Sequence, residues 1–127
     1  VGAPMFPALY ATWAALAGDR ALALQLFEAG YAAYDAGRFH QCLEYRPDHP
    51  DSETAAGPFF ANLAGMLMGL VYGLTGLEAR GAPETWPRRV AILPAGWDAI
   101  TVERIWLGDR RARLHVEHGK PAAITWL

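Results

Sequence analysis

Residues 54–77 form a run without any charged side chain, and no other feature limits the possible folds of this 127-residue chain as much. Gly65, Gly69 and Gly73 recur at every fourth position in the run, so in a helix they would lie along one face. A helix that is apolar all round belongs either in a protein core or in a membrane. The length of the run and its repeated glycines are compatible with both environments.

Two interpretations of this run are therefore open, a buried core helix and a transmembrane helix. Asn62 interrupts the run, and neither a flanking Lys/Arg cluster nor a second apolar span accompanies it. We expect a buried helix over 58–75, with Gly76 ending it and with glycines that let neighbouring helices approach closely. A membrane span at 54–77 is the alternative, and high solubility without detergent would rule it out.

The residues before this run predict an antiparallel helical hairpin. Residues 4–17 are apolar and predict a first helix that Gly18 ends. Asp19 is a suitable N-cap for a second helix over 20–36, whose Ala- and Leu-rich sequence has a high helix propensity, and Gly37 follows as its C-cap. A connection as short as Gly-Asp brings two such helices side by side.

Beyond Glu78 the pattern changes from helices to strands. Ala112, Leu114 and Val116 alternate with polar residues, which predicts a half-buried strand over 111–118. This strand pairs with a strand over 100–107 through a turn at 108–110, and further strands are expected over 89–93 and 122–126.

Helices followed by strands predict the α+β class. We expect a helical region at residues 1–77 and a small antiparallel β-domain at 78–127.

The residues between the second and third helices contain one candidate catalytic group. Glu44 lies among Phe39, Tyr45 and Arg46 in a proline-containing loop over 38–57. A carboxylate in these surroundings can act as a general base, with its ionised form favoured by the neighbouring arginine. The alternative is that Glu44 is an ordinary loop carboxylate paired with Arg46, and the spacing alone favours this alternative.

Composition excludes several other classes of function. The net charge is −2 and no basic patch is visible, so we expect no nucleic-acid partner. The four histidines do not lie at metal-ligand spacing with a cysteine pair, and no phosphate-loop or dinucleotide glycine pattern occurs, so neither a metal nor a cofactor is expected. Cys42 is the single cysteine, which excludes an internal disulfide and is compatible with a reducing, cytoplasmic location. We expect no signal peptide, because no basic segment precedes an apolar core and a cleavage site.

The balance of apolar and charged residues indicates that part of the surface is covered, either by a partner or by other parts of a larger protein. The hydrophobic fraction is 53% and the charged fraction is only 19%. A small domain that stands alone in water carries more charge than this. We therefore expect the chain to cover apolar surface against a partner or to be part of something larger.

Several phrases in 39–77 resemble the C-terminal part of glycoside hydrolase family 65, in the branch of acid trehalases and related α-glucosidases. The phrases are FHQCLE at 39–44, GPFF at 57–60, GMLM at 65–68 and YGLTGL at 72–77. ILPAGW at 92–97 and the hairpin after it resemble the small β-domain that closes these proteins, so the resemblance covers about residues 38–127.

The resemblance implies that the helices are the last ones of an (α/α)6 barrel, the six-hairpin glycosidase fold. It also implies an inverting hydrolysis of α-glucosides in which Glu44 is the base that activates water and Phe39, Tyr45 and Arg46 contact the sugar. The general-acid glutamate would come from a longer parent chain. The GPFF phrase has aromatics where the family's phosphorylases have Gly-x-His, so hydrolysis rather than phosphorolysis is expected.

The expected partners are thus an α-glucoside and either the remainder of a longer parent chain or a second copy that associates through exposed apolar helices. We expect no membrane partner. The alternative function is a non-catalytic module that binds carbohydrate or protein.

Overall fold

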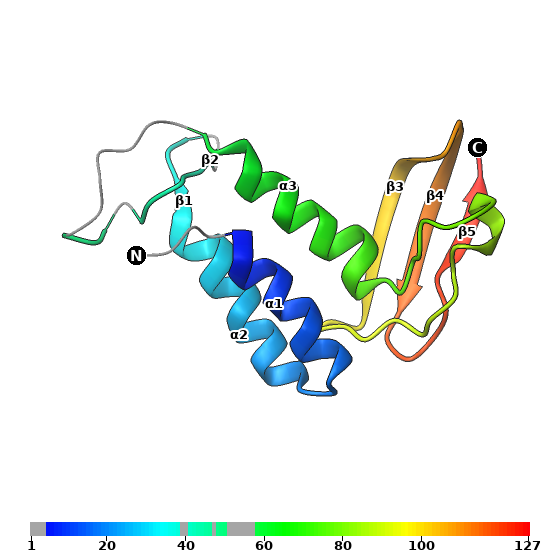
Figure 1. The fold of residues 1–127 in the computed structure, drawn as a ribbon, viewed down its shortest axis with the longest axis horizontal. Coiled ribbons are helices and arrows are strands. Elements are labelled where there is room, and N and C mark those ends of the chain that lie inside the picture. Colours follow the sequence, from blue (N-terminus) through cyan, green and yellow to red (C-terminus); the bar gives the residue numbers. More distant parts are fainter. Residues whose placement is uncertain (1–4, 39–40, 47, 51–57) are drawn as a thin grey trace.

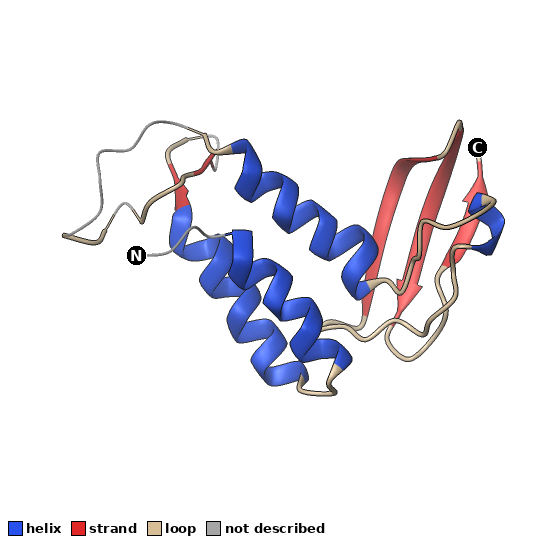
Figure 2. Cartoon of the chain, viewed as in Figure 1, coloured by secondary structure: helices blue, strands red, loops and turns tan. Residues whose placement is uncertain are grey.

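The computed structural model describes residues 5–38, 41–46, 48–50 and 58–127. Three helices lie at one end of the molecule and a three-stranded antiparallel sheet lies at the other (Figures 1 and 2). A separate two-stranded sheet lies at the far end of the helices. The α+β class is confirmed, with three helices followed by a small three-stranded antiparallel sheet; the two-stranded sheet between α2 and α3 was not predicted.

The helical hairpin forms as predicted at its turn. Helix α1 (Met5–Leu16) and helix α2 (Arg20–Tyr31) are joined through Gly18, whose φ of 88° is one that glycine adopts without strain. The Asp19 side chain accepts a hydrogen bond from the Leu22 N–H at 2.9 Å, which caps α2.

The second helix is shorter than predicted. After Tyr31 the chain forms a 3-10 turn, η1 (Ala32–Tyr34), and then a short strand, β1 (Asp35–Ala36). This strand pairs antiparallel with β2 (Gln41–Cys42), which lies inside the predicted loop. The prediction of helix to residue 36 is wrong because pairing with a segment farther along the chain overrides the local helix propensity.

Helix α3 (Phe60–Met68) continues into a π-helical segment, η2 (Gly69–Leu74). The repeated glycines are expected to let neighbouring helices approach closely, and this is observed at Gly73. An added Cβ at Gly73 would lie only 2.5 Å from the Thr12 Cγ2 atom of α1. A side chain at this position would therefore force the two helices apart.

Full burial of this third helix, however, is not observed. Phe60 is 77% exposed, and Leu67 and Met68 are 54% and 53% exposed. Within the described residues α3 packs against α1 and β2, so one of its faces has no neighbour. Among the described helices, none has both the length and the apolarity that a membrane crossing demands.

The sheet has the strand order β3 (Ala99–Leu107), β4 (Arg110–Glu117), β5 (Ala123–Trp126). The predicted alternation is confirmed, since Ala112, Leu114 and Val116 are all 0% exposed. The predicted strand over 89–93 is wrong, because this segment forms an isolated bridge from Val90 to Pro121 and no continuous ladder. The Ala91 N–H donates to the Lys120 carbonyl, whereas the Ala91 carbonyl accepts from the Gly119 N–H, so two residues of the turn lie opposite one residue of the segment and the pairing stops.

One continuous core runs from the helices into the sheet. It combines Ala14, Ala15 and Ala23 of the hairpin and Leu74 of η2 with residues in the connecting segment and on the inner face of the sheet: Leu77, Ala91, Leu93, Leu107, Ala112, Leu114, Val116 and Ala122. The core therefore passes through the predicted boundary between residues 77 and 78. Trp97 extends it toward α2, with an edge-to-face contact of 5.2 Å between its ring centroid and that of Phe27.

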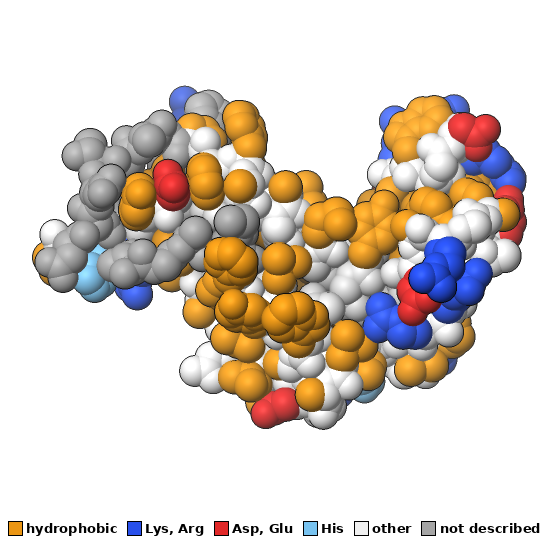
Figure 3. Space-filling model, in the orientation of Figure 1, with side chains coloured by type: hydrophobic (Ala, Val, Ile, Leu, Met, Phe, Trp, Pro, Cys, Tyr) orange, Lys and Arg blue, Asp and Glu red, His pale blue; other side chains and the backbone are white. Residues whose placement is uncertain are grey.

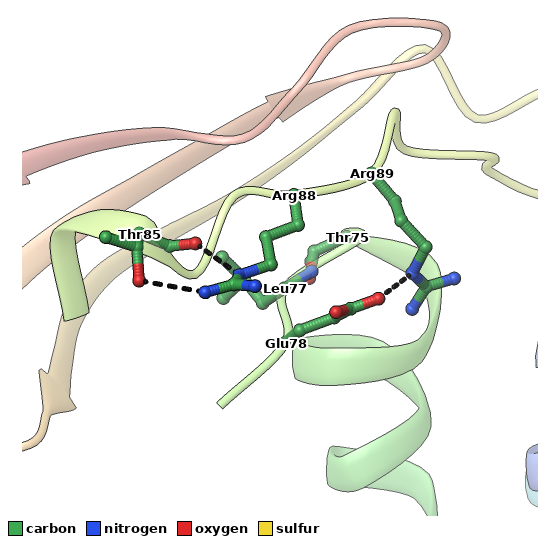
Figure 4. A network of polar contacts seen from close by, with 6 residues as sticks. All are labelled: Thr75, Leu77, Glu78, Thr85, Arg88 and Arg89. Carbon is green, nitrogen blue, oxygen red and sulfur yellow. Dashed lines mark hydrogen bonds and ion pairs between the residues drawn. The ribbon is translucent and has the colours of Figure 1, made fainter. Parts of the chain in front are cut away.

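Polar contacts also hold the turn after η2 against the segment that leads to the sheet (Figure 4). The Arg89 guanidinium pairs with the Glu78 carboxylate at 2.9 Å, and the Leu77 N–H donates to the Thr75 hydroxyl at 3.3 Å. Arg88 donates to the Thr85 carbonyl at 3.0 Å. Of these contacts, the Glu78–Arg89 pair joins the turn after η2 to the segment that leads to the sheet, and the other two are local to their turns.

Candidate functional site

The candidate site is the bend that contains Glu44, directly after β2. Backbone hydrogen bonds hold the residues on its N-terminal side: the Leu43 N–H donates to the Tyr34 carbonyl and the Phe59 N–H donates to the Cys42 carbonyl, both at 2.9 Å. Leu43 also forms an isolated antiparallel bridge with Pro58, just before α3. The start of the bend is therefore held between the end of α2 and the start of α3.

Asn62 supplies the remaining contact that holds this bend. Its side chain is 2% exposed, and its Nδ2 donates to the Leu43 carbonyl at 2.7 Å. The sequence offered a signal for this role, because a single amide inside an uncharged run must find a hydrogen-bond partner when it is buried. The sequence does not indicate which group accepts this hydrogen bond, because Asn62 and Leu43 lie 19 residues apart, so the positioning role of Asn62 is not predicted from sequence.

We expect Asn62→Ala to lower the free energy of unfolding by about 1–3 kcal/mol, because the buried Leu43 carbonyl would lose its side-chain donor. Urea unfolding followed by circular dichroism measures this loss. Gln25→Ala is the matched control, since it removes an exposed amide from the surface of α2 and should change stability by less than about 0.5 kcal/mol. Equal stability of the two variants would contradict the role of Asn62.

Arg46 lies two residues after Glu44 but is engaged elsewhere. Its Nε and Nη2 atoms donate to the two Asp48 carboxylate oxygens at 3.1 Å and 2.9 Å, a fork-like pair at the surface. This pair lowers the pKa of Asp48 through the hydrogen bond from Arg46. The expected pairing of Arg46 with Glu44 is not observed, because Asp48 offers both of its oxygens to the planar guanidinium.

The carboxylate of Glu44 is partly buried, and within the described ranges no hydrogen bond or ion pair involves it. Tyr45 follows it in the same bend and is also partly buried. Phe39, the other residue expected to contact a sugar, lies outside the described residues. The structure thus places Glu44, Tyr45 and Arg46 on one held bend and directs Arg46 toward Asp48.

Two buried ionisable groups lie at the base of this bend. Tyr34 and Cys42 are 6% and 1% exposed. Burial raises the pKa of the Cys42 thiol against the opposing effect of a hydrogen bond with Asn62. Burial likewise raises the pKa of the Tyr34 phenol, with the Arg46 charge acting in the opposite direction. A thiol with these properties is a packing group rather than a nucleophile.

These pKa shifts predict a loss of stability at alkaline pH. In the unfolded chain the thiol and the phenol lose their protons near pH 8.5 and 10, earlier than in the folded protein. The folded state then holds more protons, so the free energy of unfolding falls as pH rises above about 8.5. Urea unfolding between pH 7 and 11 measures this fall.

Cys42→Ala combined with Tyr34→Phe should flatten that pH dependence. Tyr10→Phe is the control, because Tyr10 is 43% exposed. An unchanged slope in the double variant would contradict the assignment.

A second concave region lies at the other end of α3. It is an apolar pocket of about 410 Å³ lined by Met68, Tyr72, Leu77 and Ala79. Figure 3 shows the surface hollowed between the helical part and the sheet, with hydrophobic side chains in the hollow. The described lining residues include no carboxylate or histidine, so this pocket suits apolar contact rather than acid–base chemistry.

Across the described residues no group of three or more His, Cys, Asp or Glu side chains lies close enough together to hold a metal ion. Comparisons of the chain with protein-family models, with curated proteins and with solved structures find no match. Any proposal about function therefore depends on the Glu44 bend, on the exposed surfaces and on the resemblance in 39–77.

Proposed function

We propose that the chain is the C-terminal portion of a carbohydrate-active enzyme, an inverting α-glucoside hydrolase in which Glu44 is the general base. The geometry of the Glu44 bend is the observation that carries this proposal. Leu43 is held by Tyr34 and Asn62, while the carboxylate of the next residue has no partner within the described ranges. To position a water molecule, a general base needs a fixed backbone and a carboxylate that is not already paired with another group.

In this reaction the Glu44 carboxylate accepts a proton from a water molecule as the water oxygen attacks the anomeric carbon. The bond from that carbon to the leaving oxygen breaks, and a second carboxylic acid protonates the leaving oxygen. Inverting enzymes hold the two carboxyl groups about 6.5–9.5 Å apart, which leaves room for the water. We assign the acid to a longer parent chain, so the 127-residue chain is inactive alone.

The exposed face of α1 supports a larger assembly. Phe6, Tyr10 and Trp13 are 49%, 43% and 65% exposed and form one row along the helix. Their ring centroids are 6.2 Å apart from Phe6 to Tyr10 and 5.5 Å apart from Tyr10 to Trp13. Apolar rows of this kind are normally covered by a partner. Further helices of an (α/α)6 barrel, or a second copy of the chain, would cover this row together with the exposed side of α3.

The test is Glu44→Gln in the protein encoded by the complete reading frame, assayed on trehalose and related α-glucosides. We expect kcat to fall by about 10²–10⁴-fold, the usual contribution of general acid–base catalysis. Glu28→Gln, which removes an exposed carboxylate from α2, should leave the rate within a few fold. Robust hydrolysis by the 127-residue chain alone would contradict the assignment of the acid to a longer parent chain.

A second candidate function is a non-catalytic module that binds carbohydrate or protein. The aromatic row of α1 favours it, because exposed aromatic rings are common at binding surfaces. The same Glu44→Gln variant separates the two functions. Weakened sugar binding with an unchanged rate supports the module, and a large loss of rate with intact binding supports the hydrolase.

A further inference from the structure

The outer face of the three-stranded sheet carries an exposed tryptophan that the core does not use. Trp106 is 63% exposed, whereas the next residue, Leu107, is 0% exposed. Side chains alternate between the two faces of a strand, so Trp106 lies on the face opposite to the buried residues of β3 and β4. Figure 3 shows many of the Lys and Arg side chains at this end of the molecule, while the helical end is mainly hydrophobic.

Two arginines lie next to Trp106 on this face. Arg111 is its direct cross-strand partner in the β3–β4 register, and such pairs have Cβ atoms about 4.5–5.5 Å apart. Arg104 precedes Trp106 by two positions on β3, which places it on the same face about 6.5–7 Å away along the strand. A β-bulge between Val102 and Ile105 lies at this point of the strand. We call Arg104, Trp106 and Arg111 the Trp106 face.

Among the described residues, no carboxylate pairs with the two arginines of the Trp106 face. Arg104 and Arg111 are exposed, and in the described part of the chain neither forms an ion pair. The neighbouring arginines differ: Arg113 pairs with Glu103 at 2.9 Å, and Arg110 pairs with Glu84 and covers the Trp126 ring at 3.9 Å. Residues 99–127 contain five Lys/Arg and three Asp/Glu, although the whole chain has a net charge of −2. The positive charge is therefore local to this part of the chain.

We infer that the Trp106 face binds an acidic carbohydrate, with a sugar ring lying on the Trp106 indole and its carboxylate accepting hydrogen bonds from Arg111 and Arg104. An indole offers a flat apolar surface with a negative face, which suits the C–H side of a sugar ring. A guanidinium matches a carboxylate in geometry and charge.

Nucleic acid fits this face less well. A single-stranded nucleic acid needs several stacked bases and several phosphate contacts, whereas one exposed ring and two uncommitted cations suit one acidic sugar unit. This site lies on the sheet and does not depend on the hydrolytic role proposed for Glu44.

Isothermal titration calorimetry of the 127-residue chain with hexagalacturonate tests the inference, with maltohexaose as a neutral glycan of the same length. We expect saturable, salt-sensitive binding of the acidic hexamer and at least tenfold weaker binding of the neutral one. Trp106→Ala should abolish the binding. Arg104→Gln combined with Arg111→Gln should weaken it by about tenfold or more, as expected for lost charge-assisted hydrogen bonds.

Two matched controls should bind like the unaltered chain. Phe60→Ala removes an aromatic ring that is 77% exposed on α3, and Arg80→Gln removes an exposed arginine outside the sheet. Three results would overturn the inference: absence of saturable hexagalacturonate binding, an equal loss in Phe60→Ala, or tighter binding of a dT oligonucleotide of the same charge. The measurement is binding at the sheet and not hydrolysis, so failure of the hydrolase proposal and failure of this one are distinguishable.

Discussion

Gly76→Ala lowers the free energy of unfolding by about 2–5 kcal/mol, a large part of the stability of a small domain. Gly76 ends the helical part with a φ of 75°, and a non-glycine residue in this conformation costs about 1–2 kcal/mol. An added Cβ would also lie 3.0 Å from the Arg89 carbonyl carbon and closer still to its oxygen. Relieving this overlap requires a backbone shift, at a further cost of about 1–3 kcal/mol.

Gly96→Ala separates these two contributions. Gly96 has a similar φ of 78°, but a Cβ added there meets nothing within 4 Å. We expect it to cost only the conformational term of about 1–2 kcal/mol. Urea unfolding of the two variants, measured side by side, gives the loss of stability in each. If both alanine variants lose the same stability, the close approach of Gly76 to Arg89 does not contribute.

Arg20→Met should cost about 2–4 kcal/mol, because the Arg20 side chain satisfies carbonyl groups that would then be unpaired. Its Nε donates to the Leu93 carbonyl at 2.7 Å, and its Nη2 donates to the carbonyls of Pro94 and Trp97 at 3.2 Å and 3.4 Å. Leu93 and Pro94 are fully buried, so water cannot readily replace the guanidinium there. Methionine keeps most of the apolar stem, which isolates the loss of the donors.

The control for this prediction is Arg88→Met. Arg88 is exposed and donates to the nearby Thr85 carbonyl, so its replacement should change stability by less than about 0.5 kcal/mol. Arg20 joins the start of α2 to the segment before the sheet, so its loss should also reduce the cooperativity between the helices and the strands. Equal unfolding midpoints for the two variants would contradict this role.

Local chemistry was enough to predict the elements whose determinants lie close together in the sequence. The turn at Gly18 and Asp19 forms as expected, and the alternation around Leu114 correctly gives the inner face of β4. The failures depend on distant contacts. Residues 35–36 have helix-forming neighbours but pair with 41–42, and Val90 and Ala91 meet the turn at 119–121 rather than a further strand. No local sequence pattern predicts either pairing.

At the candidate site, too, the contacts between residues of different elements could not be predicted from local sequence. Glu44 was singled out through its neighbours and through the resemblance in 39–77, and its role stays a prediction. The engagement of Arg46 with Asp48 was not predicted, because two carboxylates lie at equal distance from Arg46 in the sequence. The hydrogen bond from Asn62 to the Leu43 carbonyl was not predicted either, since it joins residues of different elements.

The bridge between Leu43 and Pro58 has a consequence for how this protein can diversify. It brings together the two ends of the segment 44–57, so the helices on either side do not depend on the number of residues between them. Doubling the length of a flexible loop between fixed ends costs only about 0.6 kcal/mol. Insertions and deletions between Glu44 and Pro58 should therefore cost little stability, and they would vary the surface beside Glu44 while the carboxylate stays in place.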